Sequence, residues 1–201
     1  MKMFHSPASP YVRKVRAVAI ECGMLDKIEN LSCAASPINR DATIVAANPL
    51  GQVPTFFTDD GMVLYDSRVI CEYVDSLGGG KLFGTGAARW QALVDQSLGD
   101  GILGAALLAR YETFLRPEAL RWSNWTDGQL DKVAKSIDAI EKVASGYGSR
   151  VDIGTITIGC ALGYLDFRFP DLGWRKGHDK TAAWFKSFDE RPSMKATRPH
   201  A

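Results

Sequence analysis

The sequence has almost no excess of charge of either sign. Its 201 residues carry 24 Lys and Arg against 23 Asp and Glu, a formal net charge of +1. Proteins that hold a nucleic-acid backbone or an anionic membrane generally need a strong positive field, which this composition does not supply. We therefore expect no nucleic acid and no membrane among the partners, and a small neutral or weakly charged ligand fits better.

Paired cysteines and metal-ligand clusters are also absent from the sequence. No two cysteines form a CxxC pair, and no group of His and Cys stands at metal-ligand spacing. No cysteine has an adjacent Lys, Arg or His that would lower its thiol pKa. We expect no metal and no external redox cofactor. We interpret the four cysteines as reduced core residues in preference to catalytic ones: Cys22, Cys33, Cys71 and Cys160.

The sequence contains no long hydrophobic run, internal repeat or low-complexity segment. The nearly apolar stretch 101–109 is too short for a bilayer, which needs about 20 residues. The first residues, MKMFHSP, become polar too soon for a signal peptide. With 46% hydrophobic and 23% charged residues, the composition predicts an ordinary folded protein, which we expect in the cytoplasm.

The first 78 residues alternate strand and helix patterns. Apolar runs bounded by turn residues predict strands at 1–4, 28–33, 53–57 and 62–64. Helical spacing of apolar residues predicts helices at 10–22, 37–46 and 67–77, the last ended by three glycines. The predicted order is βαβαββα.

The rest of the chain predicts helices alone. Amphipathic patterns begin at Trp90 and cover 130–144, and a nearly apolar helix is predicted from Asp152 to about Phe167. Asp152 is a good N-cap, with Thr155 at the position of its reciprocal partner. Because a helix that is apolar on all sides must be covered by other helices, we place it at the core of a bundle.

Three short segments carry the chemistry: SPASPYVRKVR at 6–16, NPLGQVP at 48–54 and YDS at 65–67. In this order and spacing they resemble the glutathione-site segments of cytosolic glutathione S-transferases of the bacterial type, with serine at the thiol-activating position. The resemblance covers essentially the whole chain. It implies an α/β thioredoxin-like N-terminal domain over 1–78, an all-α helical bundle domain over 86–201, a site in the cleft between them, and a homodimer.

Ser9 is the candidate for thiol activation. As a helix N-cap before Pro10, it would stand beside unpaired N–H groups and the positive end of the helix dipole. Lowering the pKa of the glutathione thiol by about two units needs about 2.7 kcal/mol. The dipole supplies about 0.3 to 1 kcal/mol, and a hydrogen bond from the serine hydroxyl to the charged sulfur about 1.5 to 3 kcal/mol. Plain helix capping is the alternative, Ser6 and Tyr11 are rival hydroxyls, and we expect His5 to be a strand-end side chain rather than a base.

The segment before the third strand is the candidate for holding the peptide backbone of glutathione. Val53-Pro54 resembles the family's cis-proline, and a cis bond before proline costs only about 0.5 to 1 kcal/mol. Such a turn would leave the Val53 N–H and C=O free to pair with the cysteinyl backbone as an added strand does. The alternative is a structural loop with a trans proline. Gln52 is a further polar contact for the same peptide.

Asp66 and Ser67 stand where the third helix begins. Free N–H groups and a short hydroxyl can hold the γ-glutamyl carboxylate, and Asp66 can take the ammonium group. A plain helix cap is the alternative. We expect Arg13 and Arg68 to be solvated or paired with acids.

By resemblance, residues near 108–117 line the pocket for the electrophile, with Tyr111 as its hydroxyl. We interpret Trp122 and Trp125 as core residues in preference to pocket residues. The resemblance implies a glutathione transferase that joins the glutathione thiolate to small electrophiles. A glutathione-dependent peroxidase or isomerase on the same scaffold, or a non-catalytic binding module, is the alternative.

Overall fold

The structure, a computed structural model, describes residues 1–200. Over these residues the chain forms two compact units. The first unit contains Met1–Arg89 together with the segment that begins at Pro192, and the second contains Trp90–Arg191. The last residues of the chain therefore pack with the first unit, although they follow the helical part in sequence.

Within residues 1–200, the first unit holds a four-stranded sheet of order β2-β1-β3-β4. Strand β1 runs parallel to β2 and antiparallel to β3, and β3 pairs antiparallel with β4. The strands are β1 (Lys2–His5), β2 (Glu29–Ser32), β3 (Thr55–Phe57) and β4 (Val63–Leu64).

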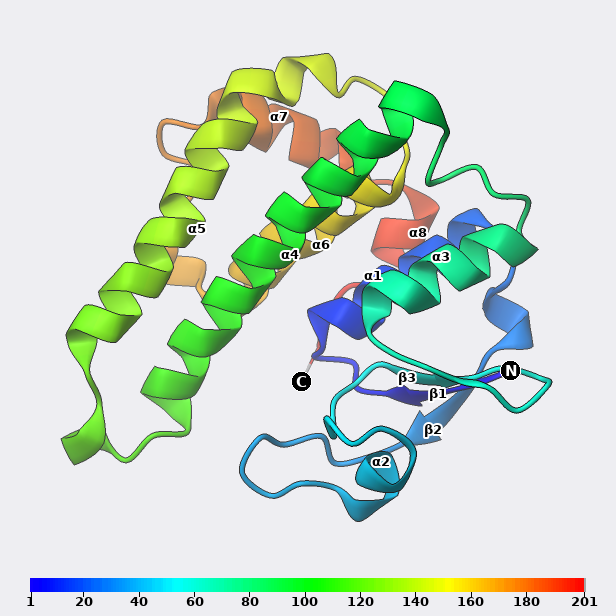
Figure 1. Ribbon diagram of the computed structural model, residues 1–201. Helices are drawn as coiled ribbons and strands as arrows, with labels where there is room; N and C mark the ends of the chain where they lie inside the picture. The colour runs from blue at the N-terminus through cyan, green and yellow to red at the C-terminus, as the bar shows by residue number, and fades with distance from the viewer. Residues whose placement is uncertain (201) are drawn as a thin grey trace. The chain divides into compact units, whose positions relative to one another are not determined.

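Three helices cover this sheet: α1 (Pro10–Glu21), α2 (Ala42–Ala47) and α3 (Ser67–Leu77). Helices α1 and α3 pack together on one side of the sheet, and α2 lies on the other side (Figure 1). The apolar residues at helical spacing on α1, including Val15 and Val18, are fully buried there. The order βαβαββα is confirmed, and the domain is thioredoxin-like.

Helix α2 is shorter than predicted, because 37–41 does not join it. Asp41 caps the helix by accepting from the Thr43 backbone N–H at 2.8 Å, and its carboxylate also accepts from the Ala34 N–H at 2.8 Å. The Ser36 hydroxyl accepts from the N–H of Asn39 at 3.1 Å. Side chains thus satisfy the backbone of this loop, a competition with helix formation that hydrophobic spacing does not reveal.

The second unit is helical, as predicted. Its helices are α4 (Gly86–Phe114), which starts in the first unit, α5 (Ser123–Val143), α6 (Ile153–Arg168) and α7 (Asp179–Phe188). By length and by a mean hydropathy of 1.2 alone, α4 would qualify as a membrane-spanning helix. Half of its apolar 18-residue window is buried within the protein. The short helix α8 (Pro192–Lys195) belongs to the first unit.

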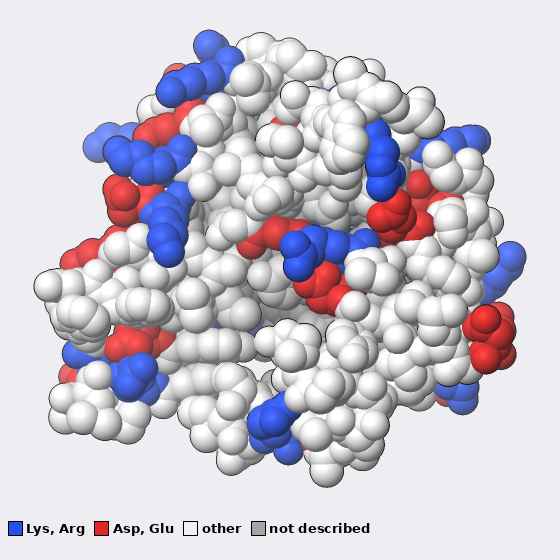
Figure 2. Space-filling model, viewed as in Figure 1, with Lys and Arg blue, Asp and Glu red and all other residues white. Residues whose placement is uncertain are grey.

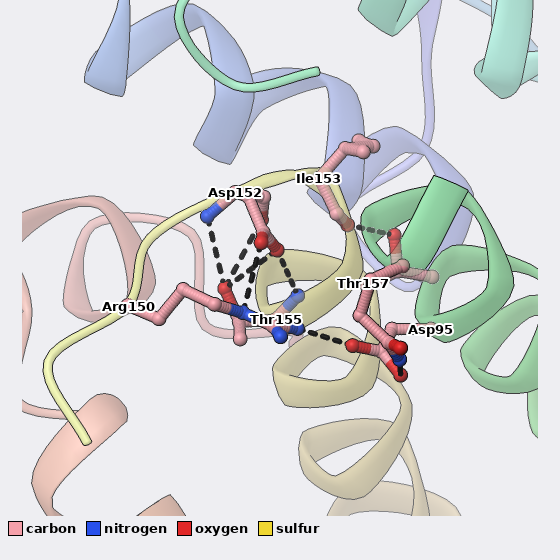
Figure 3. Close-up of polar contacts among 7 residues, drawn as sticks. Asp95, Arg150, Asp152, Ile153, Thr155 and Thr157 are labelled. Carbon is pink, nitrogen blue, oxygen red and sulfur yellow. Dashed lines mark hydrogen bonds and ion pairs between the residues drawn. The ribbon is translucent and has the colours of Figure 1, made fainter. Parts of the chain in front are cut away.

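Helix α6 is buried over most of its length and begins with a complete capping box (Figure 3). Asp152 accepts from the Thr155 N–H at 2.9 Å, and the Thr155 hydroxyl accepts from the Asp152 N–H at 3.0 Å. Arg150 extends this network, because its guanidinium pairs with Asp152 at 2.8 Å and with the buried Asp95 of α4. These ion pairs link the start of α6 to α4.

Candidate functional site

The topology of the sheet brings the three predicted segments to one end of the first unit. Strand β1 pairs antiparallel with β3, so that Phe4 lies opposite Thr55 and the loop after β1 leaves the sheet where β3 enters it. Strand β4 runs antiparallel to β3, with Leu64 opposite Phe56, so it also ends there. Residues 6–9, 53–54 and 65–67 therefore meet at the same edge, although they are far apart in sequence.

Ser9 lies at the N-cap of α1, with Pro10 at the first helical position. Its hydroxyl oxygen accepts from the Val12 backbone N–H at 3.3 Å. Among residues 1–200 the hydroxyl makes no other hydrogen bond, so its hydrogen can be donated to a further acceptor. The helix cap and the proposed thiolate contact are thus compatible uses of one side chain, because one needs the oxygen lone pair and the other the hydrogen.

Of the other groups near Ser9, His5 is less suited to act on a thiol. The Nε2 atom of His5 lies 3.0 Å from Nη1 of Arg16, which can only donate, so the imidazole lone pair at Nε2 is occupied. Burial and the positive charge of Arg16 also lower the pKa of His5. Tyr11 has the ammonium of Lys14 at 5.8 Å from its ring. The prediction that His5 is a strand-end side chain is confirmed, since β1 ends there.

The Val53–Pro54 peptide bond is cis, as the resemblance implied. In the part of the chain that the structure describes, the N–H and C=O of Val53 have no hydrogen-bond partner. Strand pairing begins only at Thr55. A free donor and a free acceptor on one residue, just before a strand begins, are what an extended peptide needs in order to pair there.

Two buried residues that the sequence analysis did not single out hold this turn in place. The Asn48 side-chain amide donates to the Thr55 hydroxyl at 2.9 Å, and that hydroxyl donates to the Gln52 carbonyl oxygen at 2.7 Å. Asn48 is 1% exposed and Thr55 is fully buried. The Gln52 side chain, in contrast, is exposed to solvent. Because Asn48 begins the NPLGQVP segment, its position before a proline-rich turn is the signal that could have indicated this role.

Asp66 and Ser67 begin α3 as predicted. Asp66 is the N-cap, where its carboxylate accepts from the Arg68 N–H at 3.0 Å and pairs with the Arg68 guanidinium at 2.9 Å. Burial opposes ionisation, but the bonds from Arg68 hold the pKa of Asp66 below its ordinary value. Ser67 is buried, and among residues 1–200 its hydroxyl and N–H make no hydrogen bond. The peptide bond between Tyr65 and Asp66 is cis.

Two basic residues of α1 are buried, so the expectation that Arg13 is solvated is wrong. Arg13 is 3% exposed and donates to the Met194 carbonyl oxygen at 3.1 Å, because α8 packs on α1. Lys14 is fully buried, and its positive charge helps to keep Asp66 ionised. The prediction for Arg68 is confirmed by its pair with Asp66. Lys14 follows Tyr11 by three residues and precedes Val18 by four, so helical spacing could have placed it on the buried face.

In the second unit, Tyr111 of α4 is half-buried, and burial raises the pKa of its hydroxyl. The interpretation of Trp122 and Trp125 as core residues is wrong. Trp122 is 61% exposed and Trp125 is 42% exposed. Their backbone is nevertheless ordered, because the Trp122 N–H donates to the Glu112 carboxylate at 2.9 Å where α5 begins. Spacing alone could not distinguish an exposed aromatic in the first turn of α5 from a buried one.

None of the four cysteines forms a disulfide bond, and Cys71 and Cys160 are buried as predicted. Cys22 and Cys33 are only partly buried, which corrects their expected place in the core. Burial and the neighbouring carboxylate of Asp75 raise the pKa of Cys22 to about 12, and burial raises the pKa of Cys33. Such thiols are poor nucleophiles at neutral pH. Over residues 1–200 no group of three or more His, Cys, Asp or Glu side chains is placed to hold a metal ion.

Comparison with known protein families gives two matches along the chain. Residues 8–77 match the glutathione S-transferase N-terminal domain, and residues 123–187 match the glutathione S-transferase C-terminal domain. The chain is also 30% identical to an uncharacterized GST-like protein, YibF of Escherichia coli (strain K12), over 99% of this chain and 98% of that protein.

Solved structures show the same likeness. A glutathione transferase family member from Pseudomonas fluorescens Pf-5 with bound glutathione is 45% identical, with a TM-score of 0.96 over 100% of this chain and 99% of that one. A family member from the same organism with bound S-(propanoic acid)-glutathione is 44% identical, with a TM-score of 0.92 over the whole of both chains.

Proposed function

Because the chain belongs to the glutathione S-transferase family, we propose that it is a glutathione transferase, which joins the thiolate of glutathione to small, mostly apolar electrophiles. The observation that carries this proposal is the convergence of Ser9, Val53 and Ser67 at one end of the sheet. Each of the three presents a donor that is not used within the described residues, and together they match the parts of an extended tripeptide.

Glutathione would lie along this edge in a fixed direction. The N–H and C=O of Val53, held by the cis bond to Pro54, would pair with the backbone of its cysteinyl residue, and Gln52 would contact the same peptide. The N–H and hydroxyl of Ser67 would hold the γ-glutamyl carboxylate at the start of α3. The carboxylate of Asp66 would pair with both the exposed Arg68 and the γ-glutamyl ammonium group.

Ser9 would then lie beside the cysteinyl sulfur and stabilise it as the thiolate. The helix dipole alone supplies about 0.3 to 1 kcal/mol at such a position. A hydrogen bond to a charged group contributes about 1.5 to 3 kcal/mol more, enough to lower the thiol pKa by one to about two units. Ser9 thus increases the fraction of the nucleophilic form without itself attacking the substrate.

Once the thiolate has formed, the protein only has to hold the electrophile against the sulfur. The sulfur electron pair forms a bond to the electrophilic carbon while the leaving group departs with its own electron pair, and the thiol proton has already gone to solvent. Tyr111 contributes a hydroxyl to the electrophile pocket in this proposal. The ligand of the Pseudomonas fluorescens family member, S-(propanoic acid)-glutathione, supports the proposed conjugation, because this thioether has the covalent form of a conjugation product. We further propose a cytoplasmic homodimer.

Isothermal titration with glutathione, followed by an ultraviolet scan for the bound thiolate, tests the proposal. We expect binding at millimolar concentration or tighter and a thiolate band at neutral pH. If the protein does not bind glutathione at millimolar concentration, it is instead a binding module that uses this fold without glutathione chemistry. Turnover of a hydroperoxide but not of an aryl halide would instead assign a glutathione-dependent peroxidase, because only the second pocket distinguishes these activities.

A further inference from the structure

Helices α4 and α6 of the second unit run side by side in the same direction and in a constant register. A Cβ atom at Gly154 would lie 2.5 Å from Cβ of Asp95, and a Cβ atom at Gly99 would lie 2.8 Å from Cγ2 of Thr157. These two close approaches advance along both helices together. The helix backbones therefore touch at small residues over their first halves (Figure 1).

The same register places two arginines at the far end of this interface. Arg110 follows Gly99 by eleven residues, and Arg168 follows Thr157 by eleven. Eleven residues are about three helical turns, so each arginine returns to the shared face about 16 Å further along. Tyr164, seven residues after Thr157, lies on that face as well and is only 2% exposed.

Aromatic rings surround the two guanidinium groups. Arg110 lies 4.4 Å from the ring centroid of Phe114, and Arg168 lies 3.9 Å from that of Phe167. Tyr111 adds its hydroxyl beside Arg110, whose charge acts on it. A guanidinium group that lies over one aromatic ring can still donate hydrogen bonds from its edge.

No acid neutralises this pair of arginines. Over residues 1–200 neither guanidinium has an ion-pair or hydrogen-bond partner, and the Tyr164 hydroxyl has none either. The acids that neighbour them in sequence are engaged elsewhere, Glu112 with Arg116 at 2.7 Å and Asp166 with Arg175 at 2.6 Å.

The electrostatics of the group agree with this geometry. Burial and the charge of Arg110 lower the pKa of Arg168, and burial raises the pKa of Tyr164 to about 12. Two like charges held together without a counterion repel each other, whereas an anion placed between them satisfies both.

We propose that Arg110, Arg168 and Tyr164 form a binding site for the carboxylate of an organic acid, whose apolar body lies against Phe114 and Phe167. The site takes a planar carboxylate because two guanidinium groups and a hydroxyl provide several directed donors. Its role in catalysis rests on the proposed function: the acid is the second substrate of the transferase, which narrows the electrophiles to those that carry a carboxylate.

Equilibrium binding of an unreactive pair of probes tests the site without glutathione. The probes are 4-methylbenzoate and 4-methylbenzamide, which differ in charge and hardly in shape. We expect the intact protein to bind the acid more tightly than the amide. Arg110→Gln and Arg168→Gln should each weaken acid binding roughly tenfold and leave amide binding unchanged. Arg168→Lys, which keeps the charge, should recover part of the loss, and Tyr164→Phe should weaken the acid several-fold.

A matched control removes an exposed positive charge that is not part of the proposed site but lies in the same unit. Lys176→Gln, at an exposed position after α6, should leave both probes unaffected. Equal binding of acid and amide by the intact protein, or acid binding that survives both arginine changes with the circular dichroism unaltered, would overturn the proposal. If the protein binds the acid through these residues but does not bind glutathione, the carboxylate site stands and the proposed transferase function is wrong.

The reactive counterparts then connect the site to turnover. With 4-(chloromethyl)benzoate and 4-(chloromethyl)benzamide, a sulfur–carbon bond forms at the same benzylic carbon and chloride leaves with its electron pair. In the intact enzyme, kcat/KM should favour the acid, and Arg110→Gln should remove that preference through a higher KM. An unchanged preference would contradict the assignment.

Discussion

At Ser9 one hydroxyl group is expected to stabilise both a helix and a thiolate, and the two contributions can be separated. Ser9→Ala removes the acceptor for the Val12 N–H, which should reduce the free energy of unfolding by about 1 kcal/mol. It also removes the proposed hydrogen bond to sulfur, which should raise the thiol pKa of bound glutathione by about 1 to 2 units. The thiolate absorbance of the complex, followed against pH, measures the second effect.

Ser6→Ala is the matched control, because Ser6 lies in the same loop but only its backbone carbonyl oxygen is engaged, by the Ser9 N–H at 3.1 Å. We expect the thiol pKa to be unchanged in that variant. A shift with Ser6→Ala and none with Ser9→Ala would exchange the roles of the two serines.

The sequence predicted the residues of this site better than their surroundings. Ser9, Pro54 and Asp66 belong to short motifs whose local chemistry, a cap or a turn before a strand, can be interpreted from neighbours in the chain. The burial of Arg13 could not be predicted in the same way, whereas helical spacing could have placed Lys14 on the buried face. The burial of Arg13 depends on packing against α8, a segment that is distant in sequence.

Among the helices, the close contact between α4 and α6 depends on glycine at two positions. A Cβ atom at residue 99 would lie 2.8 Å from Cγ2 of Thr157 and 3.0 Å from the Ile158 backbone nitrogen. We expect Gly99→Ala to reduce the free energy of unfolding by about 1 to 3 kcal/mol, because the helices must separate. Urea unfolding measures the change.

Gly101, on the same helix, is the comparison for Gly99. A Cβ atom there has no neighbour within 4 Å among the described residues. Gly101→Ala should therefore increase stability by about 0.5 to 1 kcal/mol through helix propensity alone. Equal effects of the two substitutions would show that helix propensity, and not the contact with α6, decides both.

His178 links α5 to the start of α7 in a pH-dependent way. Its Nε2 atom lies 2.9 Å from the Asp138 carboxylate, and its Nδ1 atom lies 2.6 Å from the Trp174 carbonyl oxygen. Both partners are acceptors, so only the doubly protonated ring satisfies them. Although burial opposes protonation, these bonds raise the pKa of His178 above 6.5.

A raised pKa in the folded state gives stability that is complete below the unfolded pKa and is lost as the pH rises through the folded value. The melting temperature of the protein should therefore fall by about 1 to 3 °C more than that of His178→Gln between about pH 6 and about pH 8. His5, whose pKa is lowered, acts in the opposite direction but is present in both proteins. Parallel melting curves for the two proteins would exclude the link.

The type of each helix and strand could be predicted from the sequence, but its first and last residues could not always be. The apolar spacing of 67–77 matched α3 at both ends, because a cap and three glycines bound it. Helix α2 lost its first turn to side chains that bind the backbone, and α5 begins at Ser123 before its apolar spacing appears at 130. Hydrophobic periodicity identifies the buried face of a helix, and it does not detect polar turns at the ends.

At the scale of the whole molecule, the net charge is only +1, and the face seen in Figure 2 carries charges of both signs. On the face seen in Figure 2, Lys and Arg alternate with Asp and Glu, and large areas carry neither. Such a surface has no extended field that would attract a polyanion. An anionic ligand must therefore be recognised locally, by groups such as Arg110 and Arg168 rather than by long-range steering.

The path of the chain could not be predicted from composition. The change from mixed to helical pattern near residue 86 indicates where the helical part begins, but not that the chain comes back to the first unit at Pro192. The contacts that hold α8 there are few and specific, such as Ser193 with Glu21 and Arg13 with Met194. No periodicity encodes a contact across about 180 residues.

Met194 tests whether this returning segment stabilises the first unit. Its side chain is fully buried and its carbonyl oxygen accepts from Arg13. Met194→Ala deletes buried apolar volume, and we expect it to reduce the free energy of unfolding by about 2 to 5 kcal/mol. Lys195→Ala, the exposed neighbour on the same short helix, should change it by less than about 0.5 kcal/mol.

Hydrogen exchange would locate the loss. Protection in Met194→Ala should fall first in α1, because α8 packs directly on that helix, and it should persist in α5 and α7 of the second unit. Since Ser9 begins α1, glutathione affinity should fall together with the protection of this helix. A variant that loses stability while α1 remains fully protected would mean that the segment stabilises some other part of the protein.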